Sequence, residues 1–244
     1  MPSRGGPQLI PRPPEWRPGR SAPWSQLEAA ARRIGLDDVD RVMRGRGPGA
    51  PSPVEALGVR ASAVLVPLYQ DGEGLHVVLT RRSWHLRSHR GEVSFPGGGQ
   101  EGDETLEETA LREAHEETSL PVSQVEILGE LDHLTTVSSR SFIVPFVGVL
   151  ADRPELVPDP GEVDEILHVS LEELLSDEVF REEWWGPAEI ARPLYFFELH
   201  GDTIWGATAA ILRQFLSLAT GSDPGSGTEI DPARHAPSSW RRGR

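Results

Sequence analysis

The chain of 244 residues contains no cysteine. This absence excludes disulfide bonds, thiolate zinc sites, iron–sulfur clusters and cysteine nucleophiles. Lysine is missing as well, because all 24 basic residues are arginine, and the guanidinium group suits bidentate contacts with phosphate. Any catalysis must therefore depend on oxygen or imidazole groups.

Long apolar runs are missing too. No stretch of the sequence approaches the ~18 apolar residues that a membrane-spanning helix needs. The N-terminal region is rich in arginine and proline and lacks the apolar core of a secretory signal peptide. We therefore expect a cytoplasmic protein with no membrane partner.

Positive charge is scarce, since 38 acidic residues outnumber 24 basic ones and give a net charge of −14. A field of this sign opposes binding to polyanions, so nucleic acid is not an expected partner. Hydrophobic residues make up 37% and charged residues 25% of the chain. These values are ordinary for a globular protein and exclude full disorder and collagen.

Composition divides the chain into three parts, as expected for one domain with appendages. Residues 1–54 form a Pro/Arg-rich N-terminal extension, in which a capping box over Ser25–Glu28 predicts a short helix. Residues 55–220 carry the periodic segments of a folded domain. Residues 221–244 are rich in glycine, serine and proline, which predicts a disordered C-terminal tail.

The central part alternates between strand-like and helix-like segments. Strands are expected at residues 61–69, 75–81, 125–134, 142–150, 165–169 and 194–199. Helices are expected after the capping box of Thr105 and Glu108, after Ser170, and over residues 207–218. These elements predict a mixed sheet covered on both faces, in an α/β or α+β sandwich.

Three glutamates dominate the helix that follows Thr105. Glu113, Glu116 and Glu117 lie within an arc of about 100°, so they share one face of the helix. Repulsion between them, and with the negative end of the helix dipole, costs a few tenths of a kcal/mol per contact. A divalent cation such as Mg²⁺ or Mn²⁺ would offset this cost, because it prefers carboxylate oxygens. The alternative is a solvated acidic face without a ligand.

The spacing of these glutamates is more specific than their number. The pattern reads Gly98-x5-Glu104-x7-Arg112-Glu113-Ala114-x-Glu116-Glu117-x-Ser119-Leu120. It resembles the Nudix box, with one departure at Ser119, where the family has the glycine that favours a left-handed helix end. The resemblance implies a Nudix-type α/β/α sandwich with a mixed β-sheet, which hydrolyses a nucleoside diphosphate linked to another moiety.

The resemblance also implies roles for individual residues. Glu113, Glu116 and Glu117 would hold Mg²⁺ or Mn²⁺, helped by the backbone carbonyl of Gly98, and the cation would activate water. Arg112 and Glu104 would form an ion pair that orients these carboxylates. The catalytic base stays open among Glu116, Glu162 and Glu165. A homodimer is possible for this fold.

A second motif precedes the box. Its fixed positions are Leu79-Thr80-Arg81-Arg82-Ser83, Arg87, Gly91 and Phe95-Pro96-Gly97-Gly98. This segment resembles the signature of the coenzyme A pyrophosphatase branch, which implies cleavage of CoA or acyl-CoA to 3′,5′-ADP and (acyl-)4′-phosphopantetheine. Candidate substrate-binding residues are Arg81, Arg82, Ser83, Arg87 and His89. The alternative is that these arginines pair with acidic residues at the surface.

Two other functions stay open at this point. One is a Nudix hydrolase acting on another diphosphate, such as ADP-ribose, NADH or a nucleoside triphosphate. The other is a Nudix-like module that senses a nucleotide without cleaving it. The intact trio of glutamates argues against a pure sensor, because such a module has no need of crowded carboxylates.

Overall fold

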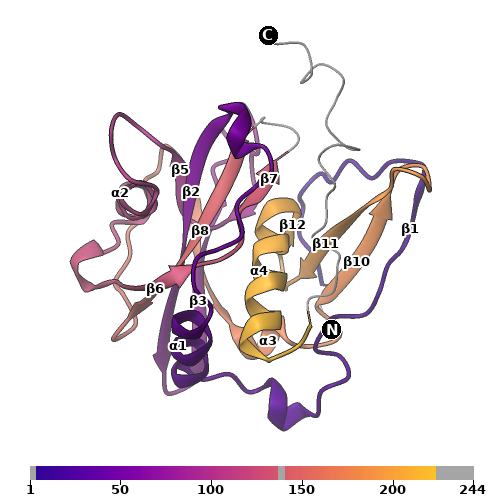
Figure 1. Ribbon diagram of the computed structural model, residues 1–244, viewed down its shortest axis with the longest axis horizontal. Coiled ribbons are helices and arrows are strands. Elements are labelled where there is room, and N and C mark those ends of the chain that lie inside the picture. The colour runs from indigo at the N-terminus through magenta and orange to yellow at the C-terminus, as the bar shows by residue number, and fades with distance from the viewer. Residues whose placement is uncertain (1–3, 137–140, 224–244) are drawn as a thin grey trace.

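The computed structural model describes residues 4–136 and 141–223, in which eight strands form a larger, mixed sheet (Figure 1). Its strands run in the order β4-β3-β2-β8-β6, with β5 and β9 pairing with β2 and β3, and β7 with β8. The bounds are β2 (Arg60–Asp71), β3 (Gly74–Arg82), β4 (Val93–Ser94), β5 (Gly97–Gly99), β6 (Glu126–Glu130), β7 (Leu134–Thr136), β8 (Ser141–Leu150) and β9 (Val163–Ser170). The pair β2 and β8 is parallel, whereas the other pairs are antiparallel.

A smaller antiparallel sheet contains β1 (Trp16–Pro18), β10 (Phe180–Trp185), β11 (Arg192–Glu198) and β12 (Thr203–Trp205). The expected strand at residues 194–199 belongs to this sheet, as β11. The other three strands are additions to the sequence-based prediction. The pairing of β1 with β10 brings the N-terminal segment beside residues 183–185.

Helices cover both faces of the larger sheet. α2 (Leu106–Thr118) packs on one face, while α1 (Leu36–Gly45) and α4 (Gly206–Ala219) lie on the other, where α4 separates the two sheets (Figure 1). The short α3 (Leu171–Leu174) follows β9. Ala110 and Ala114 of α2 are buried in one hydrophobic cluster, whereas Phe215 of α4 is buried in a second. The mixed sheet covered on both faces is therefore confirmed. No helix within the described ranges has the length and apolar character needed to cross a bilayer.

The short helix expected to start at the Ser25–Glu28 capping box and continue through residues 29–31 is only partly present, because it begins later than expected and is not an α-helix. A single 3₁₀ turn forms at Ala29–Arg32, and the first α-helix begins later, at Leu36. The Arg32 guanidinium takes the carbonyl oxygens that a helix would use, donating to Ser25 O at 2.7 Å and Leu27 O at 3.1 Å. Trp24 is fully buried against Phe180, with ring centroids 5.4 Å apart. The N-terminal segment thus packs into the core, while the expected tail beyond residue 223 lies outside the described residues.

Both ends of α2 follow the sequence signals. Thr105 Oγ1 accepts from the backbone N–H of Glu108 at 3.2 Å, and the Glu108 carboxylate accepts from the N–H of Thr105 at 2.7 Å. At the other end Ser119 adopts a left-handed conformation with φ of 56°. The position where the Nudix box has glycine therefore does require the backbone geometry that glycine adopts freely.

Ser119→Gly is expected to stabilise the protein by about 0.5–1 kcal/mol, because a side chain at positive φ is strained. Urea unfolding measured by circular dichroism checks this value. Ser123→Gly is a matched control, since Ser123 is exposed on a 3₁₀ turn and has no positive φ. A loss of stability in Ser119→Gly equal to that of the control would contradict the expectation.

Candidate functional site

The site lies where β5 meets α2. Gly97 and Gly98 of β5 pair with Val64 and Ala63 of β2. A Cβ atom on Gly97 would lie 2.6 Å from the Cα of Val64, and one on Gly98 would lie 2.6 Å from Oε2 of Glu113. Glycine at these two positions therefore lets the strand backbone approach both its neighbour and the carboxylates of α2.

Glu117 is the most buried carboxylate of the site, with 3% of the residue exposed. Its Oε2 accepts from the backbone N–H of Gly97 at 3.3 Å, and its Oε1 lies 3.5 Å from Nη1 of Arg82. Burial raises the pKa of Glu117 to about 8, and the negative charges of Glu113 and Glu162 contribute to the increase. Arg82 opposes this shift but does not cancel it. A second positive charge would stabilise the ionised form.

Glu113 and Glu116 both contact Arg112. Nη1 of Arg112 lies 3.1 Å from Oε1 of Glu113 and 2.8 Å from Oε2 of Glu116. Glu113 is half-buried, and this burial raises its pKa although Arg112 opposes the change. The Glu116 side chain is 57% exposed. The three glutamates thus differ in environment despite sharing one helix face.

The ion pair expected between Arg112 and Glu104 is present. Nε and Nη2 of Arg112 donate to the two carboxylate oxygens of Glu104 at 3.0 and 2.9 Å. Glu104 also accepts from the N–H of Glu101 at 2.8 Å and from the hydroxyl of Thr109 at 2.9 Å. These hydrogen bonds, that of Arg112 above all, lower the pKa of Glu104 to about 2. Arg112 is therefore anchored while its Nη1 faces the other carboxylates.

The carboxylates do not form a ready-made metal cage. Within residues 4–136 and 141–223, no three His, Asp or Glu side chains converge closely enough to hold a metal ion. The donor types still fit a hard divalent cation, because the Glu113 carboxylate lies against the Gly98 backbone and Glu117 adds a buried carboxylate of raised pKa. Glu116 would join them only after leaving Arg112.

Of the two distant glutamates, only Glu162 lies beside the box residues. Its Oε2 is 3.8 Å from Nη2 of Arg82, and its charge raises the pKa of both Glu113 and Glu117. Glu165 lies on β9 opposite Arg81 of β3 and forms an ion pair with it. The structure therefore brings Glu162, but not Glu165, to the carboxylates of α2.

The candidate substrate-binding residues separate into four groups. Arg81 is occupied by acidic partners, since its guanidinium donates to Asp164 at 3.1 Å and Asp202 at 2.9 Å as well as pairing with Glu165. Arg81 therefore follows the alternative interpretation, in which these arginines pair with acidic residues. Ser83 is buried and donates its N–H to the carbonyl of Glu162 at 2.7 Å. Arg82 faces Glu117, as described above.

Arg87 and His89 are exposed on the loop between β3 and β4. His89 adopts a positive φ of 54°, and its Nδ1 lies 2.9 Å from Oε2 of Glu92. Both residues remain accessible to an anionic ligand, although Glu92 already provides a partner for His89. The expected cationic cluster is thus only partly directed at the carboxylate site.

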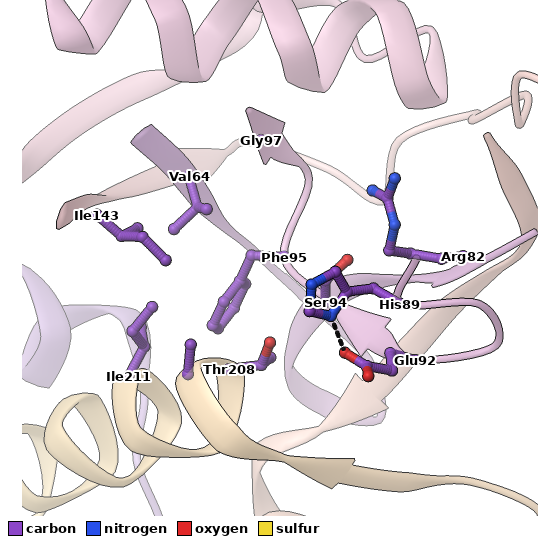
Figure 2. Close-up of a pocket in the computed structure, with 11 residues that line it drawn as sticks. Val64, Arg82, His89, Glu92, Ser94, Phe95, Gly97, Ile143, Thr208 and Ile211 are labelled. Carbon is purple, nitrogen blue, oxygen red and sulfur yellow. Dashed lines mark hydrogen bonds and ion pairs between the residues drawn. The ribbon is translucent and has the colours of Figure 1, made fainter. Parts of the chain in front are cut away.

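A cavity of about 230 Å³ adjoins the site on the α4 side of Gly97. Figure 2 shows an apolar end near Val64, Phe95, Ile143 and Ile211 and a polar end near Arg82, His89 and Glu92. Sequence reasoning did not assign the lining residues of α4, such as Thr208 and Ile211, to a site. They lie about 90 positions beyond the end of the box at Leu120, and the spacing of the box residues does not indicate that they meet it.

Comparisons with known proteins agree on the central part of the chain. A family model described as the NUDIX domain matches residues 59–192. The uncharacterized Nudix hydrolase NudL of Pectobacterium atrosepticum is 38% identical over 161 residues, covering 64% of this chain and 80% of that protein. Nudix hydrolase 15, mitochondrial, of Arabidopsis thaliana is 37% identical over 169 residues, covering 65% of this chain and 58% of that protein. The crystal structure of a MutT/nudix family protein from Enterococcus faecalis is 16% identical, with a TM-score of 0.44 over 73% of this chain and 72% of that chain.

Proposed function

We propose that this chain, which belongs to the NUDIX family, is a hydrolase of coenzyme A. Membership of the NUDIX family implies the hydrolysis of a nucleoside diphosphate derivative. The specific reaction that we propose is cleavage of the diphosphate of CoA or acyl-CoA to 3′,5′-ADP and (acyl-)4′-phosphopantetheine. This reaction uses Mg²⁺ or Mn²⁺ as cofactor.

One observation carries the CoA proposal. The end of β3 places Arg82, which belongs to the segment resembling the CoA pyrophosphatase signature, 3.5 Å from Glu117 of the acidic helix. The two motifs therefore share one site. A guanidinium beside the carboxylates can bind a phosphate oxygen that approaches a cation held by Glu117.

Glu113, Glu117 and the Gly98 carbonyl would hold the divalent cation, and Glu116 would complete the set once released by Arg112. When bound, such a cation neutralises the diphosphate, polarises phosphorus and lowers the pKa of water. Arg112 stays bound to Glu104 throughout, so the carboxylates keep their orientation.

Glu162 is the group that we assign as the general base. It is 51% exposed, so it can meet a water molecule, and it lies beside Arg82 at the edge of the acidic site. The apolar end of the cavity suits the uncharged pantetheine arm of the substrate, while its Arg82 end suits the diphosphate.

A substrate panel tests the CoA proposal. The protein is incubated with CoA, acetyl-CoA, ADP-ribose and NADH, each with Mg²⁺, with Mn²⁺ and with a chelator, and the products are identified by mass. We expect turnover of CoA to 3′,5′-ADP and 4′-phosphopantetheine only when a divalent cation is present. Turnover of ADP-ribose exceeding that of CoA by about an order of magnitude would overturn the CoA assignment and leave the diphosphatase activity intact.

A further inference from the structure

Two tryptophans are exposed within the described ranges, and they differ in their surroundings. Trp16, 41% exposed, has the Arg12 guanidinium 4.2 Å above its ring centroid. Trp84 is 39% exposed and lies on the loop between β3 and β4. Among the residues with described positions, no aromatic ring or cation covers Trp84.

One face of the Trp84 ring is backed by Gly91. A Cβ on Gly91 would lie 2.5 Å from both Cζ2 and Cζ3 of Trp84, and closer still to Cη2 between them. A point that close to three adjacent ring carbons lies over the face of the ring rather than beyond its edge. The ring therefore rests flat on the Gly91 backbone, where a side chain would displace it.

Gln8 holds the backbone of Gly91 through a hydrogen bond to its carbonyl. Its amide Nε2 donates to the carbonyl of Gly91 at 3.0 Å and to Oδ1 of Asp202 at 2.9 Å, and its Oε1 accepts from the N–H of Thr203 at 3.1 Å. Gln8 is only 8% exposed, so these hydrogen bonds are protected from water. The loop that carries Trp84 is thus held in place before any ligand arrives.

Trp84 also lies close to the acidic site. It follows Arg82 by two positions, and the intervening Ser83 donates its N–H to the carbonyl of Glu162 at 2.7 Å. His85 and Arg87 are exposed on the same loop. An exposed aromatic ring on a loop that also carries the exposed Arg87 and that follows Arg82 of the proposed diphosphate site matches the chemistry of a phosphorylated nucleoside.

We propose that Trp84 is the stacking platform for the nucleobase of the substrate, with Gly91 as its backing and Gln8 as its support. The proposal rests on the proposed function in so far as the substrate is a nucleoside diphosphate derivative, but it does not require that substrate to be CoA. A partner protein docking on Trp84 is the rival explanation for its exposure.

The test compares two probes that differ by the nucleoside. Binding of ADP and of inorganic pyrophosphate, each with Mg²⁺, is measured by calorimetry for wild type, Trp84→Ala and Trp84→Phe. Trp84→Ala is expected to weaken ADP binding about ten-fold, since its stacking partner is lost, and to leave pyrophosphate binding within about two-fold. Trp84→Phe keeps a ring and should retain most of the affinity for ADP.

Trp16→Ala is the matched control, because it removes a tryptophan of similar exposure from the smaller sheet and should change neither affinity. Equal ADP affinity in wild type and Trp84→Ala would overturn the proposal and favour the docking explanation, as would wild type that binds pyrophosphate but not ADP. Failure of the CoA proposal is separate, because it appears only in the substrate panel.

Discussion

Glu117→Gln is expected to lower kcat/KM by roughly 10³-fold, because removing the most buried of the proposed oxygen ligands would remove several kcal/mol of metal-derived transition-state stabilisation. Glutamine keeps the shape of the side chain and the hydrogen bond from the N–H of Gly97, which isolates the effect of charge. Initial rates with saturating Mn²⁺, together with Mn²⁺ binding measured by electron paramagnetic resonance, check the result. Glu107→Gln, an exposed position of the same helix, should affect neither quantity.

The same substitution should stabilise the metal-free protein at alkaline pH. The pKa of Glu117 is about 8 in the folded protein against an ordinary value of 4.5, so between these values the folded state holds a proton that the unfolded state has lost. Stability therefore falls as the pH rises from about 4.5 to about 8. Glutamine removes this penalty.

Thermal unfolding in the presence of a chelator measures the difference. We expect Glu117→Gln to unfold at a higher temperature than wild type at pH 9 and to lose this advantage at pH 4. When the chelator is replaced by saturating Mn²⁺, the unfolding temperature should rise for wild type but not for Glu117→Gln. An unfolding temperature of the variant below that of wild type at pH 9 would contradict the assignment of Glu117 as an uncompensated buried carboxylate.

Glu162→Gln is expected to lower kcat by about 10²-fold with little change in KM, because general base catalysis contributes at least that much and the residue lies at the edge of the substrate site. Glu165→Gln is the matched comparison, since Glu165 is three positions away but pairs with Arg81. Its kcat should stay within a few-fold of wild type. Equal losses in both variants, or a larger loss in Glu165→Gln, would exclude Glu162 as the base and return Glu116 to consideration.

The features that the sequence predicted are those set by neighbours along the chain. Thr105 and Glu108 are three positions apart, so their reciprocal hydrogen bonds need only the helix itself. The ion pair of Arg112 with Glu104 spans eight positions and was implied by the resemblance to the Nudix box. The left-handed end of α2 at Ser119 was visible in the same pattern.

The features that the sequence did not predict depend on partners far along the chain. β10 carries Glu182 and Glu183, both buried, which is unusual for residues of a strand. Glu183 is tolerated there because Arg12, from the N-terminal segment, and Arg181 pair with it. No local periodicity reveals a pair separated by 171 positions. The short helix expected near Ser25 is reduced to a 3₁₀ turn at Ala29–Arg32 for a related reason, since Trp24 is buried and the Arg32 side chain donates to the carbonyl oxygens of Ser25 and Leu27.

The site shows the same division. The box spacing identified Glu113, Glu116 and Glu117, but not that Arg112 would contact two of them. The choice between Glu162 and Glu165 also required the structure, because a strand pair turns Glu165 toward Arg81. The cavity wall contributed by α4 depends on the packing of that helix against the sheet.

The burial of Gln8 and the position of α4 define how much of the polypeptide the enzyme needs. The segment recognised by the family model, residues 59–192, contains every box carboxylate and Trp84. It excludes Gln8, Thr208 and Ile211, which hold the loop of Trp84 or line the cavity. A fragment cut to that segment would also lose Phe215 and the other buried side chains of α4, so the acidic helix would remain without half of the core beneath the sheet that positions it.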